Sequence, residues 1–201
     1  INLGIPGIMY VGGISGVIGA FLYEESVRAA SGVLNPFLAV IIPLLSSMLG
    51  SLLMGLIYCF LTVSLRANQN VTGLALTTFG IGFGGSLATI TKSETASVAL
   101  TQTSEFFRTA LPFASKLGWF GEVFLSYGFL AYLAIVIALL AALFFKHTRR
   151  GLYLRAVGEN PATADAAGIN VELYKYTATC LGSVIAGLGG LYYVMDYANG
   201  V

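Results

Sequence analysis

The sequence predicts an all-α membrane protein, a polytopic bundle of transmembrane helices with broken or re-entrant helices and one short cytoplasmic helix. Hydrophobic residues make up 57% of the 201 residues, charged residues make up only 9%, and the mean hydropathy is +0.84. A soluble domain carries about a quarter of its residues as Asp, Glu, Lys and Arg. Because so few charges cannot cover a water-exposed surface, lipid must solvate much of the chain.

Five segments are apolar enough to be embedded in a membrane, since a helix needs about 20 apolar residues to cross the hydrocarbon layer. None contains Asp, Glu, Lys or Arg, and they occupy residues 3–23, 36–65, 71–90, 123–145 and 176–195. We treat residues 1–201 as a single transmembrane domain. The chain opens inside an apolar segment and stops just beyond another, so we expect it to be a fragment of a longer protein.

Basic residues predict which loops face the cytoplasm, because Lys and Arg are retained on that side. The densest basic cluster lies in the loop 146–175, which we therefore place in the cytoplasm together with the connection 66–70. The loops 24–35 and 91–122 then lie outside. This assignment puts six of the 10 Lys and Arg residues inside, with three of the nine acidic residues.

Small residues recur at four-residue spacing in four of the segments, which aligns them on one helix face and lets neighbouring backbones approach closely. The positions are Gly12 and Gly16; Ser47, Ser51 and Gly55; Gly80 and Gly84; and Gly182, Ala186 and Gly190. The spacing predicts a packed bundle without indicating its function. The chain's two cysteines, Cys59 and Cys180, lie in apolar segments without a CxxC motif, so we interpret them as small buried residues and expect no disulfide and no metal site.

The loop 151–175 contains a predicted short helix. Asn160 is suited to the N-cap, and Pro161 to the first helical position, where its missing N–H is not needed. Residues 162–167 are mostly strong helix formers, and Gly168 supplies a left-handed stop. A helix of about two turns is too short to be stable alone in water. It is consistent with an element held against a partner, and equally with an ordinary surface turn between two spans.

Resemblance to a known family favours the first interpretation. The stretch 155–190, RAVGENPATADAAGINVELYKYTATCLGSVIAGLGG, is similar to the coupling-helix region of permeases that import branched-chain amino acids, simple sugars and nucleosides. The segment 2–9, NLGIPGIM, resembles the family's Asn-Leu-Gly-x-x-Gly-x-Met, although Pro6 stands where an acidic residue is frequent. The stretch 66–74, RANQNVTGL, resembles a third shared motif.

The resemblance implies that the short helix inserts into a groove on a separate ATP-binding-cassette ATPase. The implied coupling residues are Gly158, Glu159, Asn160, Pro161, Ala164, Asp165, Ala167 and Gly168. It further implies a second permease subunit, identical or homologous, and an extracellular or periplasmic substrate-binding protein. The motifs are most similar to those of nucleoside and simple-sugar permeases of the bacterial inner membrane.

ATP coupling also has support from the residues themselves. Ion-driven transporters place ionisable groups inside the membrane, whereas the five segments contain none. We therefore expect ATP and Mg²⁺ on the partner ATPase, no cofactor on this chain and no catalytic role for it. The net charge of +1 gives no reason to expect nucleic acid. The alternatives are a branched-chain amino acid permease, an ion-coupled secondary transporter or channel, and a membrane scaffold.

A substrate path is suggested by two groups of residues. Gly4, Pro6 and Gly7 interrupt helical continuity early in the first segment, with Asn2 nearby, and broken helices are tolerated where they line a cavity. Phe79 and Phe83, among the glycines of the third segment, offer aromatic faces to a base or a sugar ring. Tight helix packing explains both groups equally well.

The outer loop 91–122 is the least hydrophobic region, and its aromatic residues flank polar ones. These residues are Phe106, Phe107, Trp119 and Phe120. They suit an interfacial aromatic belt or a short surface helix, or alternatively part of a docking surface for the binding protein.

Overall fold

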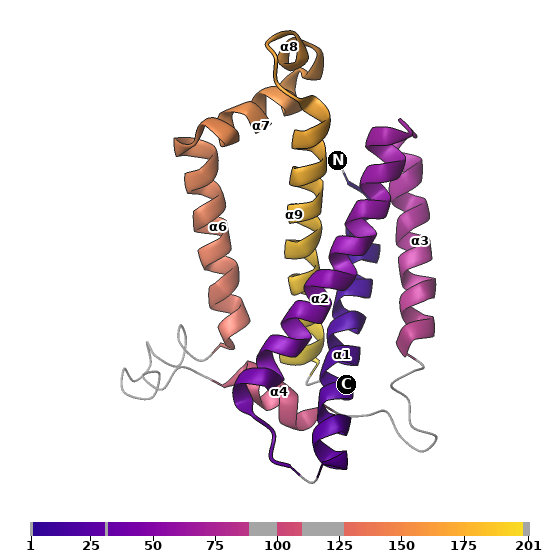
Figure 1. Cartoon of the computed structure of the whole chain (residues 1–201), viewed down its shortest axis with the longest axis vertical. Coiled ribbons are helices and arrows are strands. Elements are labelled where there is room, and N and C mark those ends of the chain that lie inside the picture. The colour runs from indigo at the N-terminus through magenta and orange to yellow at the C-terminus, as the bar shows by residue number, and fades with distance from the viewer. Residues whose placement is uncertain (1, 31, 89–99, 110–126, 199–201) are drawn as a thin grey trace.

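The computed structural model describes residues 2–30, 32–88, 100–109 and 127–198. Its long helices run up and down between two ends (Figure 1). They are α1 (Ile5–Ala29), α2 (Pro36–Cys59), α3 (Gln69–Ala88), α6 (Phe129–His147) and α9 (Val171–Tyr192). The short helices α7 (Arg149–Glu159) and α8 (Pro161–Ala166) lie at one end, which we call the α8 end, and α4 (Thr101–Arg108) lies at the other, the α4 end.

Within the described residues, four helices are long and apolar enough to cross a membrane, judged by length and composition. They are Ile5–Ala29, Pro36–Ser64, Phe129–His147 and Val171–Tyr197, and their hydropathies run from 1.5 to 2.5. The chain is therefore a multi-pass membrane protein. The remaining predicted segment, 71–90, forms α3 as far as Ala88 and is not one of these four helices, so its crossing of the membrane stays a prediction.

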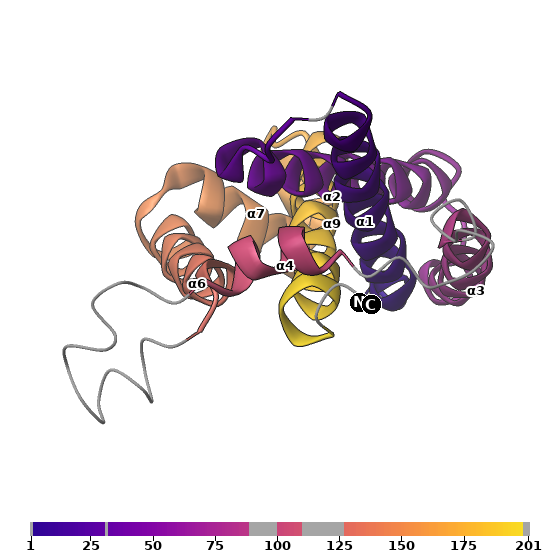
Figure 2. The same cartoon turned by 90° about the horizontal axis from the view of Figure 1, so that it is seen from below.

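The centre of the bundle is formed by α1, α2 and α9, and α3 packs against the outer side of α1. Seen from below, α3 and α6 lie on opposite sides of this central group (Figure 2). Ile8 and Val11 of α1 are buried with Met54 and Tyr58 of α2 and with Leu76 of α3. One apolar cluster thus joins three helices that are distant in the sequence.

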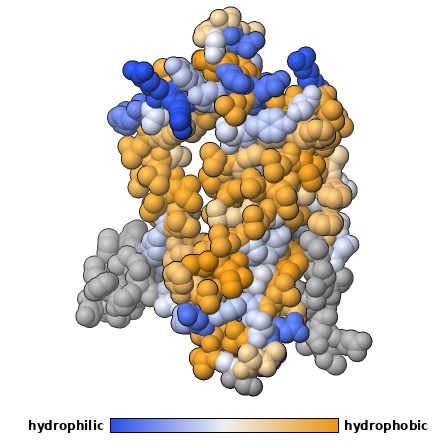
Figure 3. Space-filling model, in the orientation of Figure 1, coloured by the Kyte–Doolittle hydropathy of each residue, from blue (hydrophilic) through white to orange (hydrophobic). Residues whose placement is uncertain are grey.

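Helix α6 stands apart from the bundle. Only 6% of its most apolar stretch is buried, compared with 44% for α1. It is held at its ends: the ring of Phe129 packs on Phe107 of α4 with centroids 5.4 Å apart, and α7 continues from its other end. Apolar side chains dominate the middle of the surface, and hydrophilic ones gather toward the two ends (Figure 3).

Several boundaries differ from the predicted ones. Helix α1 continues to Ala29, so its last turns carry charged residues that follow the apolar segment. Helix α9 begins earlier than predicted, at Val171, because Asn170 caps it. Both α2 and α9 end in π-helical turns, Phe60–Ser64 and Tyr193–Tyr197. The predicted residues 123–126 and 89–90, and the aromatic residues Trp119 and Phe120, lie outside the described residues.

Candidate functional site

Helix α7 positions the loop that carries the candidate coupling site. Thr148 caps it, its Oγ1 accepting from the backbone N–H of Gly151 at 3.0 Å. The chain turns sharply here and passes close to the end of α6. A Cβ at Gly151 would lie 2.3 Å from the carbonyl oxygen of Phe144, so the turn requires glycine at this position. Figure 1 shows α7 running across the α8 end, from α6 toward α9.

Helix α8 begins and ends through local hydrogen bonds. The Asn160 Oδ1 accepts from the N–H of Thr163 at 3.1 Å, with Pro161 in the first turn, as predicted. At the other end, Gly168 has a φ of +80°, its N–H donates to Asp165, and the N–H of Ile169 donates to the carbonyl of Ala164 at 3.0 Å. This is the Schellman arrangement, in which a left-handed residue closes the last turn. The last helical residue is Ala166, so Ala167 is the C-cap rather than part of the helix as predicted.

Most of α8 faces solvent. Only Ala164 is buried, at 3% exposure, while Asp165, Ala166 and Ala167 are exposed. Figure 1 shows α8 beyond the ends of the spans. One small side chain therefore anchors a helix whose other faces are free to meet a partner.

The other predicted coupling residues flank this helix. Gly158 and Glu159 are exposed at the end of α7, and a Cβ at Gly158 would meet nothing within 4 Å. The packing of this chain therefore does not require glycine at position 158. The structure brings all eight predicted coupling residues into one continuous, mostly exposed stretch.

A groove of about 990 Å³ separates α8 from the turn between α2 and α3. Arg66 and Lys175 line it together with Asp165 and Glu172. Arg66 has a φ of +53°, a left-handed conformation that disfavours residues other than glycine and asparagine. The third family-like motif, 66–74, thus begins beside α8, a proximity that the sequence did not indicate.

The predicted path residues of the first segment lie at the start of α1 rather than in a break within it. Asn2 Oδ1 accepts from the N–H of Gly4 at 2.9 Å, which occupies that oxygen locally. Gly4 is the N-cap, and a Cβ at Gly7 would lie 2.7 Å from the carbonyl oxygen of Leu76. Gly4 and Gly7 therefore permit close packing of α1 on α3.

The two predicted aromatic path residues lie outside that contact. The rings of Phe79 and Phe83 stack with centroids 5.5 Å apart and planes within 8°. They are 53% and 45% exposed, whereas the α3 positions that meet α1 include the buried Leu76 and Gly80. The structure does not bring the rings and the start of α1 into one described cavity.

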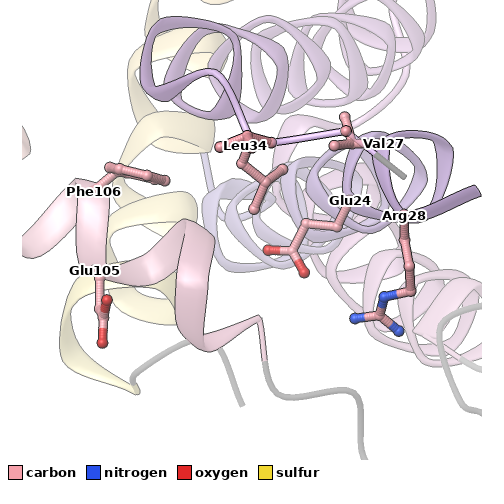
Figure 4. A pocket seen from close by; sticks show the side chains of 8 residues that line it. Glu24, Val27, Arg28, Leu34, Glu105 and Phe106 are labelled. Carbon is pink, nitrogen blue, oxygen red and sulfur yellow. The ribbon is translucent and has the colours of Figure 1, made fainter. Parts of the chain in front are cut away.

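The α4 end holds a cavity of about 560 Å³ between α1, the following connection and α4. Figure 4 shows Glu24 and Arg28 of α1 across from Glu105 and Phe106 of α4. Glu24 also caps α4, because its Oε1 accepts from the N–H of Thr103 at 3.2 Å and from the Thr103 hydroxyl. Phe106 lies in the short helix α4, and a short surface helix was one of the three predicted interpretations.

A close seam joins α2 to α9, where small residues face one another. Ser47 Oγ donates to the Gly187 carbonyl at 3.0 Å, and a Cβ at Gly55 would lie 2.6 Å from the Cβ of Ser183. The predicted positions on α2 are confirmed. On α9 the seam uses Ser183 and Gly187, whereas Gly182 would meet nothing within 4 Å.

Comparison with known proteins identifies the family. The model of the family described as branched-chain amino acid transport system, permease component, matches residues 1–201. The nucleoside ABC transporter permease protein NupC of Lactococcus lactis is 31% identical over 194 residues, covering 96% of this chain and 58% of that protein. The guanosine ABC transporter permease protein NupQ of Bacillus subtilis is 28% identical over 199 residues, covering 98% of this chain and 59% of that protein.

The chain thus spans less than two thirds of the length of these two relatives. No solved structure matches it significantly. The family model matches the whole chain, which assigns the chain to that family. The chain belongs to the family of branched-chain amino acid transport system permease components.

Proposed function

We propose that this chain is the transmembrane part of a permease subunit of an ATP-binding-cassette importer in the bacterial inner membrane, with the α8 end in the cytoplasm. It forms part of the translocation path for a nucleoside or a simple sugar. ATP hydrolysis takes place on a separate ATPase subunit, a second permease subunit completes the path, and a binding protein delivers the substrate from outside.

The observation that carries this proposal is the geometry of α8. A six-residue helix cannot hold its conformation by propensity alone, yet it is closed at both ends and exposed on most of its surface. Its alanines allow close approach of a partner, and Asp165 adds one charge. Such a helix, joined directly to α7 and α9, is suited to receive a push from a partner and to pass it to the spans.

The distribution of charge favours an external energy source. In the described spans the charged residues lie near the ends, as with Glu24 and Arg28 in α1 and Glu172 and Lys175 in α9. An ion-coupled transporter needs an ionisable group along the path. Uphill uptake that persists without an ATPase would favour that alternative.

The substrate class rests on the relatives. Their names give a nucleoside and guanosine as substrates of those proteins. A nucleoside or a simple sugar is uncharged, which suits a path without a cation. The runner-up, a branched-chain amino acid, carries a carboxylate that favours a cation or a helix N-terminus in the path. Competition for uptake among guanosine, glucose and leucine separates the three.

The test of α8 uses the intact permease, its ATPase and its binding protein in proteoliposomes. Ala166→Trp places a large ring on the exposed surface of α8, and we expect it to weaken the ATPase contact by about 2 kcal/mol, the scale of an interface hot spot. Stimulation of ATP hydrolysis by loaded binding protein should then fall. Ala142→Trp is the control, because Ala142 is exposed on α6, away from α8.

A second pair of variants tests the cap. Asn160→Ala removes the N-cap of α8, and Asn68→Ala removes the hydrogen bond to the N–H of Asn70 at the start of α3. Only the first should uncouple ATP hydrolysis from substrate. Full coupling in both Ala166→Trp and Asn160→Ala would refute the role of α8 while leaving family membership untouched.

A further inference from the structure

The only two cysteines of the chain, Cys59 and Cys180, meet at the end of the α2–α9 seam. The Cys59 thiol points at the carbonyl of Tyr176, 3.9 Å away, and Tyr176 lies one turn before Cys180 on α9. Neither the sequence pattern nor the family resemblance predicts this pairing. Two thiols brought together from separate helices form a chemical site that neither forms alone.

Helices α2 and α9 contact each other on both sides of the pair. One turn before Cys59, a Cβ at Gly55 would lie 3.9 Å from the Cα of Cys180. One turn beyond it, Ser64 Oγ and the Tyr176 hydroxyl share a hydrogen bond of 2.5 Å. A disulfide needs Cβ atoms about 3.8 Å apart, and the facing positions of Cys59 and Cys180 on closely packed helices suit that requirement.

We propose that Cys59 and Cys180 form a reversible dithiol–disulfide site that locks α2 to α9 when a small two-electron oxidant reaches it. With diamide as oxidant, both S–H bonds break and one S–S bond forms. The N=N bond of diamide accepts the two electrons and two protons and becomes a hydrazine. A dithiol reductant reverses the step by thiol–disulfide exchange.

Exposure sets the order of the two steps. Cys180 is half-buried, whereas Cys59 is fully buried. The oxidant therefore forms an adduct with the Cys180 sulfur first, and the Cys59 sulfur displaces it. This order predicts that Cys59→Ser leaves a thiol that a small maleimide labels, while Cys180→Ser leaves one that it labels far more slowly.

The lock follows from the position of the pair, and this step rests on the proposed function. Helix α9 is joined to α8 through the cap residue Asn170, whose Oδ1 accepts from the N–H of Leu173 at 3.0 Å. The cysteine pair lies in the half of α9 that is nearer α8. A disulfide there joins α9, the helix that follows α8, to α2. Helix α9 can then no longer move relative to α2.

The experiment uses membranes that hold the intact complex, treated with diamide. Trypsin then cuts at the exposed Arg149 and Arg150 of α7, between the two cysteines in the sequence. We expect the two fragments to stay joined on a non-reducing gel and to separate after reduction, with the Cys59–Cys180 peptide found by mass spectrometry. Cys59→Ser and Cys180→Ser should each abolish the link. Absence of the linked peptide from the native protein overturns the site.

Uptake of radiolabelled guanosine is measured in the same membranes. We expect diamide to abolish uptake by the native complex, reductant to restore it, and the Cys59→Ser/Cys180→Ser variant to resist the oxidant. A formed link without loss of uptake overturns the lock, as does equal loss in the variant. If the complex shows no ATP-driven uptake at all, the proposed function and the lock both fail, while the linked peptide still decides whether the thiol site exists.

Discussion

Gly190 of α9 and Met9 of α1 lie so close that a Cβ on Gly190 would be 2.0 Å from the carbonyl oxygen of Met9. The next nearest atoms are also backbone, including the N–H nitrogen of Gly13 at 3.1 Å. A side chain at position 190 can therefore be accommodated only if one helix moves. This contact holds two of the three central helices in register.

The first prediction concerns that contact. Gly190→Ala should destabilise the protein by about 1–3 kcal/mol, the range for overpacking a close contact. The midpoint of thermal unfolding in detergent measures it. Gly182→Ala is the matched control on the same helix, because a Cβ there meets nothing within 4 Å. Equal midpoints for the two variants would contradict the close approach.

The second prediction separates two glycines of the coupling loop. Gly168→Ala forces a Cβ into the left-handed region and should cost about 1–2 kcal/mol, which opens the last turn of α8. Gly158→Ala fills open space inside a helix and should stabilise α7 by up to about 1 kcal/mol. Hydrogen exchange of residues 160–169 should accelerate in the first variant alone. Acceleration in both would mean that α7 rather than the α8 stop controls the loop.

The third prediction concerns the α4 end. Glu24→Ala removes the acceptor for the N–H and hydroxyl of Thr103, and loss of such a cap costs about 1 kcal/mol. Amides of residues 101–108 should therefore exchange faster. Glu25→Ala provides the control, since Glu25 is an exposed neighbour on the same helix. Unchanged exchange in Glu24→Ala would exclude the capping role.

The fourth prediction distinguishes packing from substrate contact. Gly7→Ala brings a Cβ within 2.7 Å of the Leu76 carbonyl oxygen and should lower stability by about 1–3 kcal/mol. Phe79→Ala removes a ring that is 53% exposed, so stability should change little. If the ring lines the path, the concentration of guanosine at half-maximal uptake should rise. An unchanged value would remove Phe79 from the path.

Local signals in the sequence predicted α8 almost residue by residue. Asn160, Pro161 and Gly168 act on the backbone within one turn, so their effect is independent of the rest of the chain. Helix α7 was missed for the opposite reason. It carries arginines and no long apolar stripe, and its only strong mark is the cap residue Thr148, which lies within a basic run.

Contacts between helices were predicted only in part. Spacing identified Ser47, Ser51 and Gly55 as a packing face, but it cannot say which face of α9 opposes them. In the structure, Ser183 and Gly187 face α2 and Gly182 does not, because α9 also contacts α1 through Gly190. The meeting of Cys59 with Cys180 follows from that choice and has no local signature.

The position of α6 has a consequence for how its sequence can vary. Because the helix is secured at its tips by Phe129 and by α7, the long apolar stretch between them contributes little to the internal cohesion of the described bundle. Exchanges among aliphatic residues there should leave folding intact. The residues allowed at those positions are then limited by what contacts the helix in the membrane. Sequence variation along α6 would reflect those contacts rather than the packing of this chain.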